Sequence, residues 1–372
     1  MAMASSLSAA PAPRSLAAPL RIADVALWYG RRSGGIRTYL DAKERYAATS
    51  GAFEHHLVLT GPREHSVGTR HELRGLTAAA SNGYRLPLSM GPLAALLRRI
   101  EPDVILCHDP FWALPAALHV RDELGATVVA VNHATSAQEA AELPGPSSLY
   151  RLGFERWRRR GYGRADAVMT VAAPDVAVDC PLVPMRPGLD PEFVPRPAVA
   201  REAHVLYVGR ISRAKGLLDL LHAAAVSHDP WPLRVVGTGP AQGVADALVR
   251  RLGLEQRVTF SPFIAGRAEL AAEYARASCV VMPGQFETFG FVAFEAAACG
   301  ARVVACDTAP SAALCGALAE TFAPRDGAGL LRAIERARAA PRDAFAAARM
   351  VARHGWGPAI AAELADLVRL RG

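Results

Sequence analysis

The segment from Cys279 to Ala305 constrains the fold more than any other part of this 372-residue chain. It begins with a short apolar run, Cys279–Met282, which predicts a buried strand. Pro283-Gly284 ends that run, an alanine-rich stretch after Gly290 predicts a helix, and Val303–Ala305 predicts a second strand. Strand, loop, helix and strand in this order form the repeating unit of a parallel α/β sheet. We therefore expect a ligand near the loop, because such sheets bind ligands at the carboxyl ends of their strands.

Two glutamates lie on either side of the expected helix start, Glu287 in the loop and Glu295 a little over one turn into the helix. The first turn of a helix presents backbone N–H groups without intrahelical partners, here around Phe289 and Gly290, and such groups bind anions. Carboxylates accept hydrogen bonds from hydroxyl groups. The pattern therefore indicates a ligand with a phosphate in its middle and hydroxyls at both ends, such as a nucleotide sugar. The alternative is an ordinary crossover helix with two solvated glutamates.

These residues carry a resemblance to a known family. Glu287-x7-Glu295, with Phe289-Gly290 between the glutamates, is similar to the donor-site signature of retaining GT-B glycosyltransferases, family 4 (group 1) in particular. The resemblance covers nearly the whole chain. It implies an α/β protein of GT-B architecture, in which two doubly wound Rossmann-like domains face each other across a cleft and a C-terminal helix crosses back. The chain departs from the family at Thr308–Ser311, where a Gly-Gly-x-x-Glu loop is common.

The length and the resemblance together divide the chain into five parts. A chain of 372 residues is long enough for two domains, and prolines crowd the stretch 180–200, which predicts a linker. We expect a disordered lead at 1–19, an N-terminal acceptor-binding Rossmann-like domain at 20–180, a linker at 181–200, a C-terminal nucleotide-sugar-binding Rossmann-like domain at 201–350, and a C-terminal helix packing back on the N-terminal domain at 351–372.

Of the 42 basic residues only two are lysines, Lys43 and Lys215. A lysine retained in a chain that otherwise uses arginine is a candidate for a site that needs a compact point charge, the alternative being chance. Lys215 follows Arg210 by five positions in a loop after an expected strand, so both cations can reach one diphosphate. The spacing excludes a Walker A loop. It resembles the GR-x4-KG motif of family 4, which implies that Arg210 and Lys215 bind the donor.

Further candidates in the first half follow expected strands. Gly34 and Gly35 lead from the first strand into a helix, and paired glycines let the backbone approach a ligand closely; an ordinary tight turn is the alternative. His108 and His133 each end a strand, and the alternative for each is a structural hydrogen bond. The resemblance implies that the glycine loop lies over the donor phosphates and that His133 lies beside the transferred sugar. It leaves His108 as an acceptor-side candidate.

The segment Arg151–Arg164 carries six arginines and one glutamate, a local charge of 6 − 1 = +5. Aromatic residues at positions 150, 154 and 157 fall on one face of the expected helix. Aromatic residues next to arginines suit an anionic membrane surface. The alternative is a domain helix with its aromatic residues in the core and its arginines in water, and no motif supports nucleic acid. The membrane-surface candidates are Trp157, Arg158, Arg159 and Arg160.

Composition excludes several other classes of protein. The net charge is +7, but no uninterrupted apolar run reaches the ~20 residues that a membrane span needs. The first twenty residues lack the continuous hydrophobic stretch of a signal peptide. Six cysteines without a CxxC pair predict buried thiols in a reducing compartment and no metal cluster. We therefore expect a cytoplasmic protein, either free or peripheral at the inner face of the membrane. The family resemblance further implies that no metal or other cofactor is required.

The resemblance implies retaining transfer of a hexosyl group from a nucleotide-diphosphate sugar to a hydroxyl of a glycan, a lipid-linked or a small-molecule acceptor. The catalytic candidates are Glu287, Arg210, Lys215 and His133. The donor-binding candidates are Gly34, Gly35, Arg210, Lys215, Phe289, Gly290 and Glu295. Two alternatives remain open: a nucleotide-sugar epimerase or phosphorylase on the same fold, and a non-catalytic nucleotide-sugar-binding module.

Overall fold

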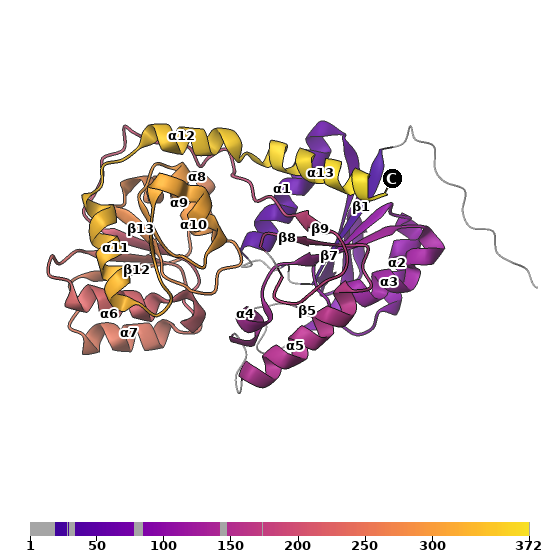
Figure 1. Ribbon diagram of the computed structural model, residues 1–372, viewed down its shortest axis with the longest axis horizontal. Helices are drawn as coiled ribbons and strands as arrows, with labels where there is room; N and C mark the ends of the chain where they lie inside the picture. The colour runs from indigo at the N-terminus through magenta and orange to yellow at the C-terminus, as the bar shows by residue number, and fades with distance from the viewer. Residues whose placement is uncertain are drawn as a thin grey trace, which may run out of the picture. The chain divides into compact units, whose positions relative to one another are not determined.

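A computed structural model describes residues 19–27, 29, 34–77, 85–141, 147–172 and 174–371. The expected disordered lead lies outside these residues except for Pro19. Contacts divide the chain into two compact units (Figure 1). The first consists of Met1–His133, Leu149–Met185 and Ile360–Gly372, and the second of Ala134–Ser148 and Arg186–Ala359.

Over the described residues, the sheet of the first unit has nine strands in the order β3-β4-β2-β1-β6-β7-β8-β9, with β5 paired to β4. All neighbours are parallel except at β3 and β5, which run antiparallel to β4. The strands are β1 (Leu20–Ala26), β2 (Phe53–Gly61), β3 (His65–Val67), β4 (Arg70–Thr77), β5 (Arg85–Pro87), β6 (Val104–Cys107), β7 (Thr127–Asn132), β8 (Ala167–Thr170) and β9 (Leu182–Pro184).

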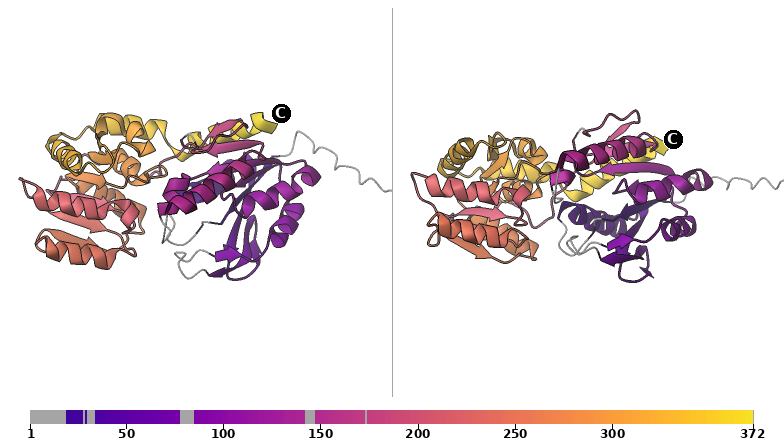
Figure 2. Two further views of the ribbon diagram at one scale, coloured as in Figure 1. Left: turned by 60° about the horizontal axis from the view of Figure 1, so that its bottom comes forward. Right: turned by 90° about the horizontal axis from the view of Figure 1, so that it is seen from below.

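Helices cover both faces of this sheet (Figure 2). The central strands β6 and β7 are almost wholly apolar and buried, as parallel strands between two helical layers must be. One apolar core joins the sheet to the side-by-side helices α2 (Gly91–Ile100) and α3 (Ala113–Leu124). The other helices of the unit are α1 (Gly35–Ser50), α5 (Ser147–Tyr162) and the part of α13 (Trp356–Arg371) from Ile360 onward.

The second unit has a six-stranded sheet over the described residues, in the order β12-β11-β10-β13-β14-β15, and every pair of neighbours is parallel. The strands are β10 (Val205–Val208), β11 (Leu233–Val236), β12 (Val258–Ser261), β13 (Cys279–Met282), β14 (Val303–Cys306) and β15 (Ala319–Phe322). The helices are α4 (Ser136–Ala141), α6 (Leu217–Val226), α7 (Gln242–Arg251), α8 (Arg267–Arg276), α9 (Phe291–Ala298), α10 (Pro310–Cys315), α11 (Gly327–Ala339) and α12 (Ala344–Arg353), with 3₁₀ turns η1 (Arg213–Lys215) and η2 (Gly316–Leu318).

The predicted fold class, two doubly wound Rossmann-like α/β domains, is confirmed. The expected linker at 181–200 contains β9, which extends the first sheet beside β8. Between β2 and β5 the chain forms the antiparallel pair β3–β4. No helix in the described part of the chain combines the length and apolarity needed to cross a membrane.

Candidate active site

Lys215 and Glu287 form an ion pair in the second unit, with 2.7 Å between Lys215 Nζ and Glu287 Oε2. Lys215 ends η1, which follows β10, and Glu287 lies in the loop that follows β13. These two strands are neighbours at the point where the strand order of the sheet reverses. Open parallel sheets bind ligands beyond the carboxyl ends of the strands at that point. The fold thus brings together two predicted site residues that are 72 positions apart.

Two glycines let the surrounding loops pack this closely. Gly216 has φ +70°, and a Cβ on it would lie 2.8 Å from the carbonyl of Pro283. Gly290, the residue before α9, has φ +92°, and a Cβ on it would lie 2.4 Å from Ser311 Oγ. Both backbone conformations strain any residue with a side chain. Sterically, position 290 of the motif therefore requires glycine.

The loop that departs from the family pattern, Thr308–Ser311, makes hydrogen bonds to the candidate site loop that follows β13. Thr308 Oγ1 donates to the carbonyl of Gln285 at 2.9 Å, and the Ser311 amide donates to the carbonyl of Phe289 at 2.9 Å. The Phe289 ring is buried against Phe294, with 5.0 Å between ring centroids. Any contact of Phe289 with a ligand must therefore come from its backbone.

Arg210 lies in the loop between β10 and η1, and its side chain is exposed. Its carbonyl accepts a hydrogen bond from the buried Tyr207 hydroxyl at 2.9 Å. Burial and the negative charge of Glu287 raise the pKa of Tyr207 well above its usual value. This loop therefore carries the two predicted cations, Arg210 exposed and Lys215 paired with Glu287.

Glu295 lies inside α9 and is buried. Its Oε2 accepts a hydrogen bond from the Tyr274 hydroxyl at 3.1 Å, and its Oε1 lies 3.3 Å from an Arg267 nitrogen. Arg267 also pairs with Asp190 at 3.2 Å. Burial raises the pKa of Glu295 to about 7, although the Arg267 charge and the Tyr274 hydrogen bond act in the opposite direction.

In the first unit, His133 and His108 lie one behind the other at the carboxyl ends of β7 and β6. His133 Nε2 is 2.7 Å from His108 Nδ1, and His108 Nε2 is 2.7 Å from Asp24 Oδ1 on the neighbouring β1. Burial lowers the pKa of His133 well below its usual value, and the adjacent His108 lowers it further. His133 Nδ1 makes no hydrogen bond within the described part of the chain.

Asp24 holds this pair within a larger buried cluster. Its Oδ2 lies 2.9 Å from Lys43 Nζ and 2.9 Å from His55 Nε2. Lys43 also lies 2.7 Å from Glu363 on α13, which accepts a hydrogen bond from the Tyr39 hydroxyl. Burial alone would raise the pKa of Asp24, but Lys43 and the two histidines hold it well below the usual value. Asp24 is therefore ionised at neutral pH.

Gly34 and Gly35 lie at the start of α1, which follows β1, so they share the carboxyl edge of the sheet with His108. Gly34 is exposed, and a Cβ on it would meet no atom within 4 Å. Residues 30–33 of this loop lie outside the described residues. The geometry of the two glycines therefore leaves room for a ligand without requiring one.

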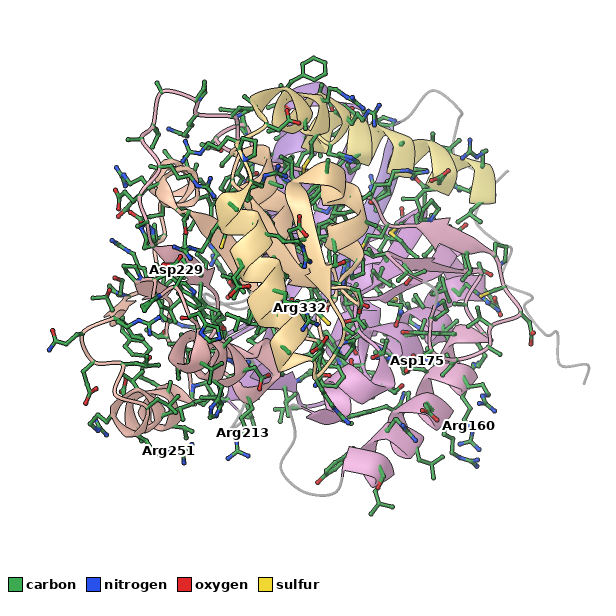
Figure 3. All side chains as sticks on the ribbon, turned by 60° about the vertical axis from the view of Figure 1, so that its left-hand side comes forward. Arg160, Asp175, Arg213, Asp229, Arg251 and Arg332 are labelled. Carbon is green, nitrogen blue, oxygen red and sulfur yellow. The ribbon has the colours of Figure 1, made fainter. Side chains whose placement is uncertain are left out.

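The basic segment forms α5, and one of its membrane-surface candidates is wrong. Arg158 is 1% exposed and pairs with Asp175 at 3.3 Å. It lies on the face of α5 that packs into the unit, so it cannot contact a membrane. Trp157 is 49% exposed and its Nε1 donates to the Pro110 carbonyl at 2.8 Å, while Arg159 and Arg160 are exposed. The Arg160 side chain projects outward from α5 (Figure 3).

Two family profiles match the chain. Glycosyltransferase Family 4 matches residues 33–176, and Glycosyl transferases group 1 matches residues 192–335. The chain belongs to the group 1, family 4 glycosyltransferases. Lys215, Glu287 and Glu295 lie inside the second match, and His108 and His133 lie inside the first.

The chain is similar to known proteins in sequence and in fold. It is 38% identical over 136 residues to the D-inositol 3-phosphate glycosyltransferase of Arthrobacter sp. (strain FB24), a match that spans 32% of each chain. It is 26% identical over 318 residues to the GDP-mannose-dependent alpha-(1-6)-phosphatidylinositol dimannoside mannosyltransferase of Mycobacterium tuberculosis (strain ATCC 25177 / H37Ra), covering 77% of this chain and 79% of that one. The sucrose-phosphate synthase from Thermosynechococcus elongatus has a similar fold, with a TM-score of 0.77 at 21% identity over 94% of this chain and 98% of that one.

Several residues that contact the candidate site residues were not predicted from the sequence. Arg267 and Tyr274 are seven positions apart and therefore share one face of α8, but nothing local indicates that this face meets Glu295. Asp24 is the one acidic residue in an otherwise mostly apolar strand, and this pattern indicates a buried charge that needs partners. Glu363 gives no local signal, because it lies in a helix with other charged residues.

Proposed function

We propose that this glycosyltransferase transfers a hexosyl group from a nucleotide-diphosphate sugar to an acceptor hydroxyl, with retention at the anomeric carbon. The observation that supports it best is the Lys215–Glu287 pair at the switch point of the second sheet. One ammonium and one carboxylate at that position match the two ends of the bond to be broken. Lys215 would bind the departing diphosphate, and Glu287 would bind sugar hydroxyls beside the reacting carbon.

The proposed chemistry consists mainly of stabilising charge on the leaving group. Arg210, Lys215 and the backbone N–H groups that begin α9 would share the negative charge of the diphosphate. The leaving phosphate would take the proton of the incoming hydroxyl on the same face of the sugar, so no protein nucleophile and no metal ion would be required. Glu295 would accept hydrogen bonds from ribose hydroxyls.

His133 would accept a hydrogen bond from a substrate hydroxyl. In the tautomer of His108 that donates its Nε2–H to Asp24, His108 Nδ1 accepts a hydrogen bond from the His133 Nε2–H. His133 Nδ1 then carries a lone pair at the carboxyl edge of the first sheet. In this arrangement Asp24 and His108 are positioning residues that fix the tautomer of His133.

The stereochemistry of the product tests this proposal. An α-linked nucleotide sugar should give an α-linked product, because donor phosphate and acceptor hydroxyl share one face. The one-bond carbon–proton coupling at the anomeric carbon of the product measures this directly, and a β product would refute retention. GDP-mannose, which the name of the mycobacterial relative specifies, is a reasonable first donor.

The alternatives give different results in the same reaction. A phosphorylase would form sugar 1-phosphate when inorganic phosphate replaces the acceptor. An epimerase would convert the nucleotide sugar without any acceptor. A non-catalytic binding module would bind nucleotide diphosphate in calorimetry and turn over none of a pooled set of donors. Chelation of metal ions with EDTA should leave the rate of the proposed transferase unchanged.

A further inference from the structure

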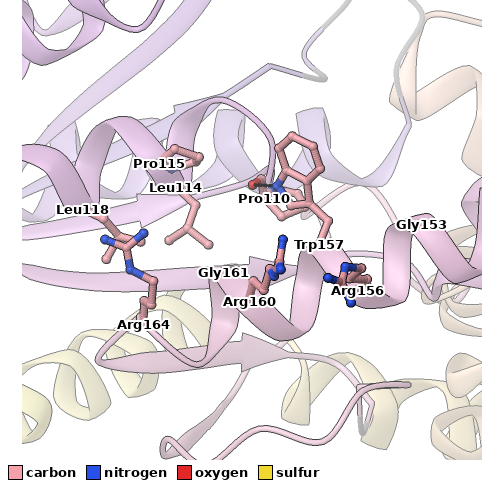
Figure 4. Close-up of a pocket in the computed structure, with 10 residues that line it drawn as sticks. All are labelled: Pro110, Leu114, Pro115, Leu118, Gly153, Arg156, Trp157, Arg160, Gly161 and Arg164. Carbon is pink, nitrogen blue, oxygen red and sulfur yellow. Dashed lines mark hydrogen bonds between the residues drawn. The ribbon is translucent and has the colours of Figure 1, made fainter.

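A groove of about 460 Å³ lies on the first unit between α3 and α5. Apolar side chains from α3, among them Leu114 and Leu118, line one side of it, and α5 lines the other (Figure 4). Trp157 forms part of the α5 side, where its hydrogen bond to Pro110 holds the indole in place. The groove belongs to the first unit, whereas the predicted donor residues other than Gly34 and Gly35 belong to the second.

Three arginines lie along the α5 side of this groove, Arg156, Arg160 and Arg164. Arg156 and Arg160 are four positions apart and so fall on one face of α5, and Arg164 follows in the turn after the helix. All three are exposed. Within the described part of the chain, none of the three guanidinium groups has a carboxylate partner. Arg158, which points the other way, is paired with Asp175. The groove therefore combines an apolar wall with uncompensated positive charge.

The same face of α5 continues beyond the groove with apolar residues. Leu149 is 68% exposed and Leu152 is 64% exposed. They precede Arg156 by seven and four positions, which places them on the arginine face. Large exposed leucines next to a cationic groove suit a ligand that carries both an anionic group and hydrocarbon. Nucleic acid and acidic proteins would not require the leucines.

We propose that this groove binds the phosphate headgroup of an anionic phospholipid and seats the first unit on a membrane surface. The arginines bind lipid phosphate, the α3 side chains contact the glycerol and upper acyl region, and the two leucines enter the interface. This inference goes beyond the proposed function, because it concerns where the enzyme binds and does not depend on which sugar it transfers. It also replaces the sequence-based surface centred on positions 157–160 with the face at 149, 152, 156, 160 and 164.

The test is co-sedimentation of the full chain with vesicles of phosphatidylcholine alone or with added phosphatidylglycerol. Each arginine near an anionic surface raises the partition coefficient of the protein onto anionic vesicles roughly fivefold. The triple variant Arg156→Ser/Arg160→Ser/Arg164→Ser should therefore lower that coefficient about a hundredfold. A matched control removes three exposed arginines elsewhere, Arg250→Ser/Arg251→Ser/Arg353→Ser, with the same change in net charge. Its partition should fall far less. Arg251 is labelled in Figure 3.

A second variant, Leu149→Ser/Leu152→Ser, keeps all the charges and tests the apolar contact. Its partition into anionic vesicles should fall at least severalfold, and the loss should persist at several times 0.1 M salt, where charge is screened within a few ångströms. Equal partition of the groove and control variants would overturn the proposal. So would tight binding of inorganic phosphate in calorimetry with no effect of the leucine variant, because the groove would then be a site for a soluble anion. Thermal unfolding of each variant verifies that it is folded.

Discussion

Lys215 Nζ lies 2.7 Å from Glu287 Oε2, although one residue follows β10 and the other follows β13. Each side chain thus lies beside a group of opposite charge. The Lys215 side chain is one-third exposed and the Glu287 side chain 10% exposed, so an entering ligand can reach the pair. A nucleotide sugar would exchange this single ion pair for two contacts, phosphate to Lys215 and sugar hydroxyl to Glu287.

Lys215→Ala is expected to reduce turnover by two or more orders of magnitude, because it removes a charge that stabilises the leaving diphosphate. Lys215→Arg should also be slow, since a planar guanidinium does not replace a compact ammonium. Arg213→Ala is the matched control, because this exposed arginine lies in the same 3₁₀ turn. Steady-state kinetics measure all three. A rate near wild type for Lys215→Ala would remove the diphosphate assignment.

Glu287→Ala and Glu295→Ala should affect different quantities. Glu287 is expected to bind the sugar, so its removal should lower kcat more than nucleotide affinity. Glu295 is expected to bind the ribose, so its removal should weaken binding of the free nucleotide diphosphate. Calorimetry with that nucleotide separates the two effects. Loss of binding in Glu287→Ala with unchanged binding in Glu295→Ala would reverse the two roles.

The stability of the second unit should fall with rising pH through the titration of Glu295. Its pKa in the folded protein is raised to about 7 from a usual value near 4.5, so folding favours the protonated carboxyl. The stabilising contribution is complete below pH 4.5 and is lost as the pH rises through 7. The Glu295→Gln side chain cannot ionise. The free energy of unfolding of this variant, relative to wild type, should therefore be up to about 3 kcal/mol higher at pH 8 than at pH 4.5. Urea unfolding at both pH values measures this difference, and a pH-independent difference would contradict it.

Asp24→Asn should destabilise the first unit by about 3–5 kcal/mol at neutral pH, because it removes one partner from a buried ion pair. Folding lowers the pKa of Asp24, so this difference should be complete above the usual pKa of an aspartate, begin to shrink below it, and disappear only as the pH falls through the lowered pKa of the folded protein. If the role of Asp24 is purely structural, these effects on stability are the only ones expected.

The positioning role of Asp24 makes a second, separable prediction. In wild type, nitrogen NMR should show His133 neutral with its proton on Nε2, and Asp24→Asn should disturb that tautomer. His108→Gln should disturb it as well, whereas His119→Gln, on α3 away from this cluster, should not. A proton on His133 Nδ1 in the wild-type protein at neutral pH would exclude the proposed acceptor role.

The strand–loop–helix–strand unit from Cys279 to Ala305 could be predicted from the sequence. The predicted strands Cys279–Met282 and Val303–Ala305 fall on β13 and β14, and the predicted helix between them is α9. The spacing of apolar residues and the positions of proline and glycine are local features of the sequence, and they determine directly where helices and strands begin and end. The same locality explains why the Glu287–Glu295 spacing and the Arg210–Lys215 spacing were visible.

Other features depended on which elements become neighbours. The sequence identified Lys43 only as an unusual lysine, and the fold gave it Asp24 on β1 and Glu363 on α13 as partners. A run of arginines predicted a solvated face, yet the helical turn directed Arg158 inward to Asp175. The sequence by itself therefore determined the α/β fold and the Glu287–Glu295 motif, because both follow from short-range patterns. Only the tertiary structure decided the partners of the buried charges, because a desolvated ion must find its counter-charge wherever packing places one.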